Sequence, residues 1–324
     1  ILILLNSDEC LQKMARANIM DTRENNKAIA NSLLQNFLQC SSNALSVIMV
    51  YLQQYLRSVF DDRVDEKITS NRYDDAHSIL WTFTEFCKYF MSADEFASTI
   101  FSFSSMIDKH DMAIPWAFHI WRAVLTRSNS FEDSMAIAKQ SSYLAKSFGN
   151  DFDFFSSFWL GGLKTMLFDQ SVYQFSEKYK NKVTNEHLES AKSNHMQVRL
   201  EFVTFTKNLK QQWTTELTSR EAYTLLTKCI LPRAQFGLED AFFANEFLFC
   251  FFDNNEICVI MDVLFESLFA SELVSLTSAS VAYFGFFMKK CFEKLLDIKE
   301  TLPKENILCQ KLLLWSCSLT SNVA

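Results

Sequence analysis

The chain has 324 residues, of which 49% are hydrophobic and 32 are Phe, with only 5 Gly and 3 Pro. So few turn-forming residues disfavour sheets with tight turns and predict an all-α fold of long helices joined by short polar segments. The formal net charge of −7 argues against strong autonomous binding of nucleic acid, because the averaged field repels phosphate backbones. The chain starts inside an apolar run without an initiator Met, so we expect an internal piece of a longer protein.

Two uncharged stretches do not predict membrane spans. Residues 28–56 are interrupted by Asn, Gln and Ser, and residues 273–288 are short and carry Ser and Thr. The nine cysteines are scattered without a Cys-x-x-Cys pair, which predicts small buried side chains in a reducing compartment. We therefore expect no association with a membrane.

Apolar residues recur three and four positions apart, as on one face of a helix. In chain order, this pattern predicts helices over 45–59 and 257–268, with breaks near residues 61–62, 70–71, 128–129, 149–150, 161–162 and 253–255. Each apolar stripe needs a neighbouring helix to cover it, so we expect an elongated, irregular α-solenoid of stacked helical hairpins. The most polar stretch, 178–199, is predicted to be a linker or exposed helix between an N-terminal part of the array, 1–177, and a C-terminal part, 200–324.

The three prolines are predicted to lie at helix boundaries. Pro115 and Pro303 precede periodic apolar runs and suit the first turn of a helix. Pro232 follows the apolar run 223–231 and should end that helix.

No pattern in the sequence predicts catalysis, a cofactor or a metal site. The only glycine pair, Gly161-Gly162, lacks the context of a phosphate-binding loop, and the five histidines lack the spacing of zinc ligands. Carboxylate doublets such as Asp61-Asp62 and Asp74-Asp75 are interpreted as solvated residues at helix starts. We therefore expect a protein that is not an enzyme.

A group of basic residues leaves contact with RNA open. They could line one helix face, with Trp213 as a platform on which bases stack, and they are Lys192, Arg199, Lys207, Lys210 and Arg220. Acidic neighbours such as Glu201 and Glu216 dilute their field. We favour a solvated helix and expect RNA to be contacted indirectly or weakly.

The window from residue 225 to residue 247 combines a predicted helix stop with a helix start. Cys229-Ile230-Leu231-Pro232-Arg233 is followed after six residues by Asp240-Ala241, and then by Phe247. Gly237 permits the chain to reverse, and Glu239 and Asp240 occupy the first turn of the next helix, where negative charge is stabilised. We expect Arg233 to reach Asp240 across the turn. Docking of a partner by Arg233 is the alternative.

This window, Cys-Ile-Leu-Pro-Arg, then Asp-Ala, then a downstream Phe, resembles the central region of the family of the largest THO complex subunit, THO complex subunit 2. Residues 108–115 look like the family's Asp-Leu-Ala-x-Pro helix start, Phe158-Trp159 and Tyr173 are similar to its Phe-Trp and downstream Tyr, and residues 283–287 are similar to its aromatic-Gly-Arg-Phe-Leu step. The likeness runs from about residue 108 to residue 297. The chain departs from the family at residues 243–245, where the family usually has Tyr-Cys-Ala.

The resemblance implies a nuclear scaffold of the THO/TREX assembly, which couples transcription to mRNP packaging and mRNA export. It implies an α-solenoid that is HEAT-like or similar to the middle domain of the eukaryotic initiation scaffold. Other THO subunits and a DEAD-box mRNA-export helicase are the implied partners. The structural or partner-docking motif is then Pro232, Arg233, Asp240, Ala241 and Phe247. A helical scaffold of a nuclear pore or vesicle coat is the alternative.

Overall fold

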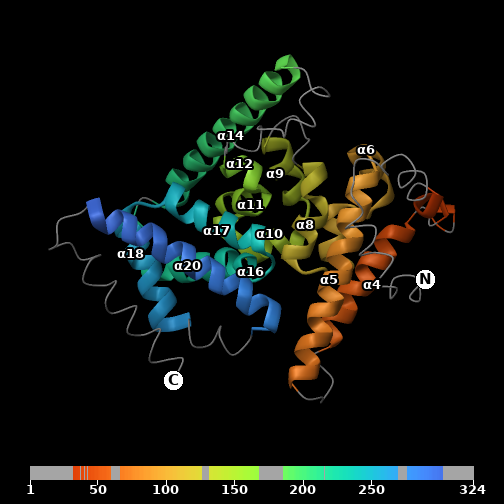
Figure 1. Ribbon diagram of the computed structural model, residues 1–324, viewed down its shortest axis with the longest axis horizontal. Coiled ribbons are helices and arrows are strands. Elements are labelled where there is room, and N and C mark those ends of the chain that lie inside the picture. The colour runs from red at the N-terminus through yellow and green to blue at the C-terminus, as the bar shows by residue number, and fades with distance from the viewer. Residues whose placement is uncertain are drawn as a thin grey trace. The chain divides into compact units, whose positions relative to one another are not determined.

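The computed structural model describes residues 32–36, 38–39, 41, 43–59, 66–125, 131–167, 185–214, 216–268 and 276–301. Every regular element within these ranges is a helix, which confirms the all-α prediction for them (Figure 1). No helix in the described part of the chain is both long and apolar enough to cross a membrane. The chain divides into two compact units, residues 1–146 and 147–324. The predicted division around 178–199 stays a prediction.

The first unit is a set of helices of varied length. In chain order they are α4 (Ala44–Ser58), α5 (Glu66–Phe90), α6 (Ala93–Thr99), α7 (Phe103–Asp108), α8 (Ile114–Leu125), α9 (Phe131–Lys139) and the larger part of α10 (Ser142–Phe148), which ends two residues past the boundary of the unit. The bounds of α4 confirm the helix expected over 45–59.

The break expected near Ser70 and Asn71 is wrong, because both residues lie inside α5. Ser and Asn each cost only a fraction of a kcal/mol in a helix interior relative to Ala, up to about 0.7 kcal/mol. The buried stripe that includes Leu80 and Phe83 outweighs that cost. The breaks near 61–62 and 128–129, like Pro303, lie outside the described residues.

Two residues of the 108–115 segment organise helix starts in the first unit. Pro115 is the second residue of α8. Amides in the first turn of a helix have no acceptor within that helix, so a proline, which lacks the amide hydrogen, loses no hydrogen bond there. The carboxylate of Asp108 caps α10, since it accepts hydrogen bonds from the amide of Tyr143 at 3.0 Å and from the hydroxyl of Ser141 at 2.8 Å. Burial raises the pKa of Asp108, but these hydrogen bonds together outweigh burial and leave the pKa below its ordinary value.

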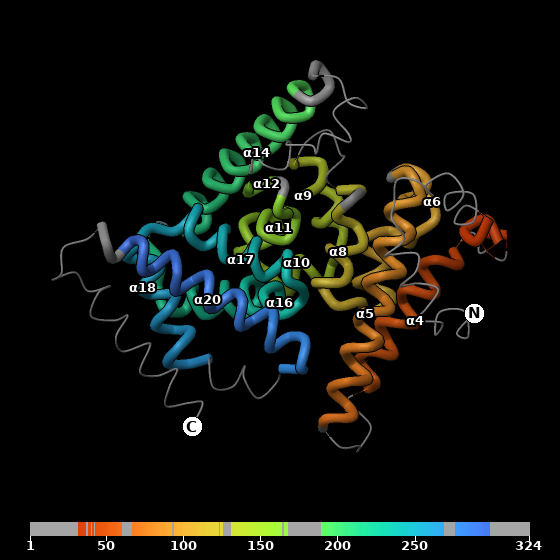
Figure 2. Tube along the Cα trace, in the orientation of Figure 1, coloured from red at the N-terminus to blue at the C-terminus, as the bar shows by residue number. Residues whose placement is uncertain are grey.

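The second unit contains two successive helical hairpins after a first group of helices. Its elements are η1 (Gly149–Asp151), α11 (Phe152–Leu160), α12 (Leu163–Met166), α14 (Asn185–Trp213), α15 (Ser219–Leu225), η3 (Leu226–Ile230), α16 (Leu231–Ala234), α17 (Leu238–Phe251), α18 (Asn254–Val263), η4 (Leu264–Leu268) and α20 (Ser278–Thr301). The first hairpin is the run from α15 to α16 followed by α17, and α16 packs on α17. The second is α18 and η4 followed by α20, with Phe265 against Phe292. Between the hairpins, α15 packs on α18, and α17 packs on α20 (Figure 2).

The polar stretch predicted as a linker or exposed helix lies partly in α14, which continues without interruption from Asn185 to Trp213. Its residues from Glu189 to Glu201 are exposed or half-buried. Arg199 is held there by a hydrogen bond from its Nε to the carbonyl of Met166 at 2.7 Å.

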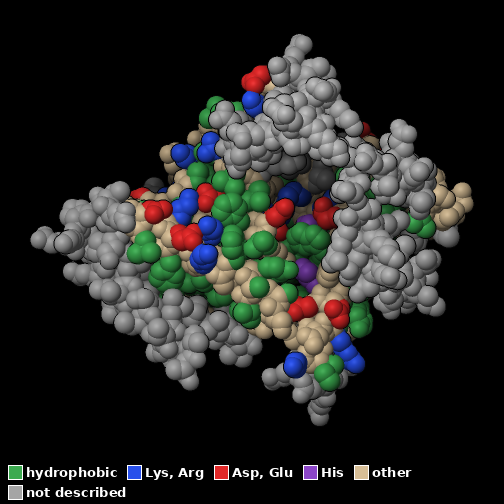
Figure 3. Space-filling model, viewed as in Figure 1, with side chains coloured by type: hydrophobic (Ala, Val, Ile, Leu, Met, Phe, Trp, Pro, Cys, Tyr) green, Lys and Arg blue, Asp and Glu red, His purple; other side chains and the backbone are tan. Residues whose placement is uncertain are grey.

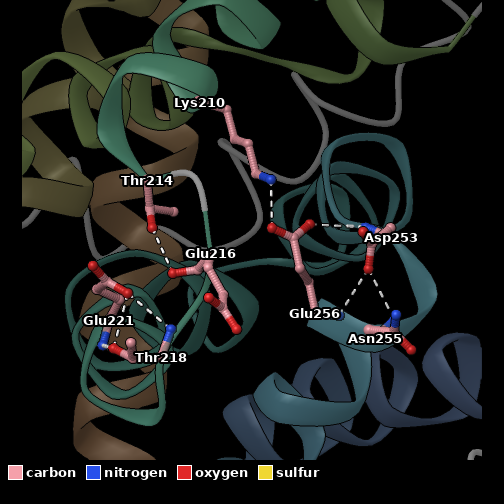
Figure 4. Close-up of polar contacts among 8 residues, drawn as sticks. All are labelled: Lys210, Thr214, Glu216, Thr218, Glu221, Asp253, Asn255 and Glu256. Carbon is pink, nitrogen blue, oxygen red and sulfur yellow. Dashed lines mark hydrogen bonds and ion pairs between the residues drawn. The ribbon is translucent and has the colours of Figure 1, made fainter.

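The far end of α14 is tied to the start of α18 through one carboxylate (Figure 4). Lys210 forms an ion pair with Glu256, whose second oxygen accepts from the amide of Asp253 at 3.0 Å and so completes the capping box of α18. Trp213 stacks on Phe154 with 4.6 Å between ring centroids. One ring face of Trp213 is therefore part of the protein's own packing and is not open to a base.

Candidate functional site: the arginine junction

The helical run that carries the central motif passes through Pro232 without ending. α15, the π-helical η3 and α16 follow one another directly, and the run ends at Gln235. The prediction that Pro232 terminates its helix is therefore wrong. The π-helical turn before the proline explains the tolerance, because the amide of Leu231 bonds to the carbonyl of Leu226, five residues back, and the tight α-helical register is relaxed there.

Arg233, the next residue, projects into the interior of the second unit and is fully buried. Its Nε donates to Asp240 Oδ1 at 2.7 Å, its Nη1 to the carbonyl of Phe158 at 2.5 Å and its Nη2 to the carbonyl of Gly161 at 2.7 Å. A guanidinium supplies several donors in a rigid planar fork, which an ammonium cannot do. Arg233 thus joins α16, the start of α17 and the end of α11. We call Phe158, Gly161, Arg233, Asp240 and Phe243 the arginine junction.

The arginine junction closes the C-terminal end of α11. The last carbonyls of a helix have no partner inside that helix and carry the negative end of its dipole. Phe158 and Gly161 present such carbonyls, and a buried cation that donates to both satisfies them and neutralises part of their field. The same cation is paired with Asp240 in the first turn of α17, where a negative charge is also favoured by the helix dipole.

Aromatic rings enclose the guanidinium of Arg233. Its central carbon lies 3.7 Å from the ring centroid of Phe243, 5.2 Å from that of Phe158 and 5.9 Å from that of Trp159. The negative face of an aromatic ring attracts a cation, and this attraction grows when water is excluded. Rings and hydrogen-bond acceptors together compensate a buried charge that would otherwise be very costly.

Gly161 is the point of closest approach in the arginine junction. A Cβ atom at this position would lie 2.5 Å from the Cζ of Phe202 and 2.6 Å from the Cζ of Phe243. The backbone of Gly161 has ordinary dihedral angles, so the requirement for glycine here is one of space. Its missing side chain lets the carbonyl reach Arg233 while two rings pack over it.

The remaining residues of the predicted motif are placed by the same packing. Ala241 and Phe247 are fully buried on α17, and the ring of Phe247 meets that of Phe158 edge to face with 4.9 Å between centroids. Arg233 and Asp240 are also buried, so these four side chains offer no surface to a partner. Pro232 is half-buried.

Cys229 lies in η3 and is fully buried close to the arginine junction. Burial raises the pKa of its thiol well above the ordinary value, more than the charge of Arg233 lowers it. A thiol held neutral in this way is a poor nucleophile. Within the described ranges no group of three or more His, Cys, Asp or Glu side chains could hold a metal ion.

The sequence predicts the contact between Arg233 and Asp240 but not the partners that come from α11. It offers Gly161 only as half of a glycine pair, and the carbonyl of Phe158 has no signature in a sequence. The Phe158-Trp159 pair was a signal for this region, since both residues contact the Arg233 guanidinium. No local spacing links positions that are more than seventy residues apart, as Arg233 and Phe158 are.

Two comparisons with known proteins bear on this region. A family model described as "Transcription factor/nuclear export subunit protein 2" (Tho2) matches residues 153–303, the part of the chain that contains the arginine junction. The chain is also 24% identical over 351 residues to THO complex subunit 2 of Saccharomyces cerevisiae, an alignment that covers 99% of this chain and 21% of the yeast protein. The chain therefore spans about a fifth of the length of that relative.

Proposed function

From its confirmed resemblance to the THO complex subunit 2 family, we propose that this chain is a helical segment of a THO/TREX subunit. It acts as a scaffold on which other THO subunits assemble, and it binds rather than catalyses. By this role the protein works in the nucleus and couples transcription to mRNP packaging and mRNA export. A DEAD-box mRNA-export helicase is a further proposed partner, and contact with RNA is indirect or weak.

One observation carries the proposal. Five of the residues on which the resemblance rests come together in one buried cluster within the region that the family model matches, namely Phe158, Trp159, Arg233, Asp240 and Phe247. A motif of this kind fixes how successive helices sit against one another. Such rigidity is what a scaffold needs to hold partner sites at set positions.

The packing of the second unit supports the proposed α-solenoid. Helices in corresponding places of the two hairpins pair with each other, α15 with α18 and α17 with α20. Both leading helices start with a capping box, at Thr218 and at Asp253, and both continue into a π-helical turn. We propose that these stacked hairpins, HEAT-like in kind, form part of an α-solenoid.

Affinity purification of the full-length protein from nuclear extract tests the scaffold role. Mass spectrometry would identify the co-purifying chains, with a parallel sample treated with RNase. We expect the other THO subunits and a DEAD-box helicase to remain after RNase treatment, because the contacts are between proteins. Recovery of nucleoporins or coat proteins in their place would support the alternative scaffold and refute this function.

A further inference from the structure

An exposed apolar surface lies on the second unit where α17 and α20 run together. We call it the α17–α20 face, and it consists of Leu238, Phe242, Val281, Ala282, Gly285 and Phe286. Leu238 is 53% exposed and Val281 is 51% exposed. Hydrophobic side chains gather over α17 and α20 in the space-filling view (Figure 3). Large exposed side chains in a group, unlike single ones, mark surfaces that bind other molecules.

Contacts between the two helices show that these residues are neighbours. The ring centroids of Phe242 and Phe286 are 6.1 Å apart. Further along both helices, Lys294 Nζ forms an ion pair with Glu246 Oε1 at 3.1 Å. The helices therefore run in the same direction. Leu238 stands one turn before Phe242, and Ala282 one turn before Phe286, so both helices carry exposed apolar residues one turn before the contact between the two rings.

The missing side chain of Gly285 leaves an open space on the surface of α20, which we call the gap at Gly285. A Cβ atom at Gly285 would meet nothing within 4 Å, so the position opens outward. Ala282, Gly285, Phe286 and Lys289 occupy positions i, i+3, i+4 and i+7, which is the spacing of the four residues around a hole in knobs-into-holes packing. Two of these four are among the smallest residues. A helix can therefore approach α20 closely here and place a large apolar side chain over Gly285.

The end of the α17–α20 face nearest the middle of α20 is positively charged. The side chain of Lys289 is 69% exposed. The Nζ of Lys290 lies 5.8 Å from the ring centroid of Phe286. Both lysines pair with one carboxylate, that of Glu293, at 3.8 Å and 2.6 Å. Two cations and one anion leave a net charge of +1 at this end. An occupant with an acidic side chain at this place complements that charge.

We propose that the α17–α20 face binds an amphipathic helix of another protein subunit. A large apolar side chain of that helix enters the gap at Gly285, and an acidic residue faces Lys289. The inference deepens the proposed scaffold function and rests on it. Helix-in-groove recognition of this kind uses apolar residues spaced three and four apart.

The open position of Gly285 provides a variant that blocks the face and leaves the fold intact. Gly285→Glu fills the gap and repels an acidic partner. The same change should stabilise α20, because it removes a glycine from the helix interior and places a Glu four residues before Lys289, where the two side chains can pair. Leu296→Glu is the matched control, because Leu296 is 52% exposed on α20 three turns beyond the gap. The melting temperature of Gly285→Glu should equal or exceed that of the wild type.

The test is a site-specific photo-crosslink in the full-length protein. A photoreactive amino acid replaces Val281, cells are irradiated, and the joined peptides are identified by mass spectrometry. We expect a peptide from another protein, with apolar residues at helical spacing and an Asp or Glu next to them. Gly285→Glu should lower the yield of this crosslink about tenfold, the effect of losing roughly 1.4 kcal/mol of binding free energy. Leu296→Glu should leave the yield unchanged.

Three results would overturn the inference. They are a crosslink to a second copy or to another part of the same chain, a partner peptide without an acidic residue, and a yield no higher than that from the same photoreactive residue at position 296. If THO subunits still co-purify in any of these cases, the scaffold function stands and only the binding face is refuted. If no THO subunit co-purifies with the wild type, the scaffold function itself is refuted.

Discussion

The indole Nε1 of Trp159 donates a hydrogen bond of 3.3 Å to the backbone carbonyl of Lys228, four residues before Pro232. That carbonyl is the one that the amide of residue 232 would reach in an α-helix, and proline has no amide hydrogen to give. A side chain from α11 thus supplies the donor that Pro232 lacks. The proline and the tryptophan, both part of the family resemblance, are connected through one carbonyl.

Trp159→Phe should reveal this connection. The change keeps most of the ring but removes the donor, and we expect the free energy of unfolding to fall by about 1 kcal/mol beyond the loss of ring volume, because the Lys228 carbonyl is left without a partner. In a Pro232→Ala background the loss should be smaller, since the amide hydrogen that alanine restores at this position can donate to that carbonyl. Urea unfolding of the four proteins measures the coupling. Equal losses in both backgrounds would disprove the connection.

Arg233→Lys should destabilise the protein although it conserves the charge. A lysine cannot reach Asp240 and the carbonyls of Phe158 and Gly161 together, so buried groups lose their partners. We expect a loss of about 3–5 kcal/mol, the range for a broken buried ion pair. The exposed Arg220 gives the control, and Arg220→Lys should change stability by less than about 0.5 kcal/mol. Similar melting temperatures for both variants would contradict the role of Arg233.

Two glycine substitutions should have opposite effects. Gly161→Ala places a methyl group within 3 Å of two buried rings, and such overpacking costs about 1–3 kcal/mol. Gly285→Ala meets nothing and lies within α20, so it should stabilise the helix by about 0.5–1 kcal/mol. Thermal unfolding of the two variants against the wild type checks the signs. A stable Gly161→Ala protein would mean that Phe202 and Phe243 can move aside.

Acid should destabilise the first unit through Glu85. Burial raises the pKa of this carboxyl, but hydrogen bonding to His119 and the charge of Lys88 outweigh burial and lower the pKa from 4.5 to about 2. A carboxyl with a lowered pKa stabilises the fold above pH 4.5, and this contribution disappears as the pH falls toward 2. Glu85→Gln should therefore flatten the fall of the melting temperature over that interval. An unchanged slope would show that Glu85 does not contribute.

The fold class and most local features followed from sequence because they depend on residues close together in the chain. Few glycines and prolines and a helical apolar period determine the all-α fold. The acidic residues Glu239 and Asp240 lie in the first turn of α17, as charge and dipole require. Pro115 likewise lies in the first turn of α8.

The tertiary structure alone decided how the central motif works. Pro232 stays inside a helix because a π-helical turn precedes it and a distant tryptophan supplies a donor. Gly161 is required because two rings from other helices occupy the space of its side chain. Sequence periodicity carries information over a few turns, whereas these contacts join positions about seventy residues apart, and only the packed chain brings them within hydrogen-bond distance.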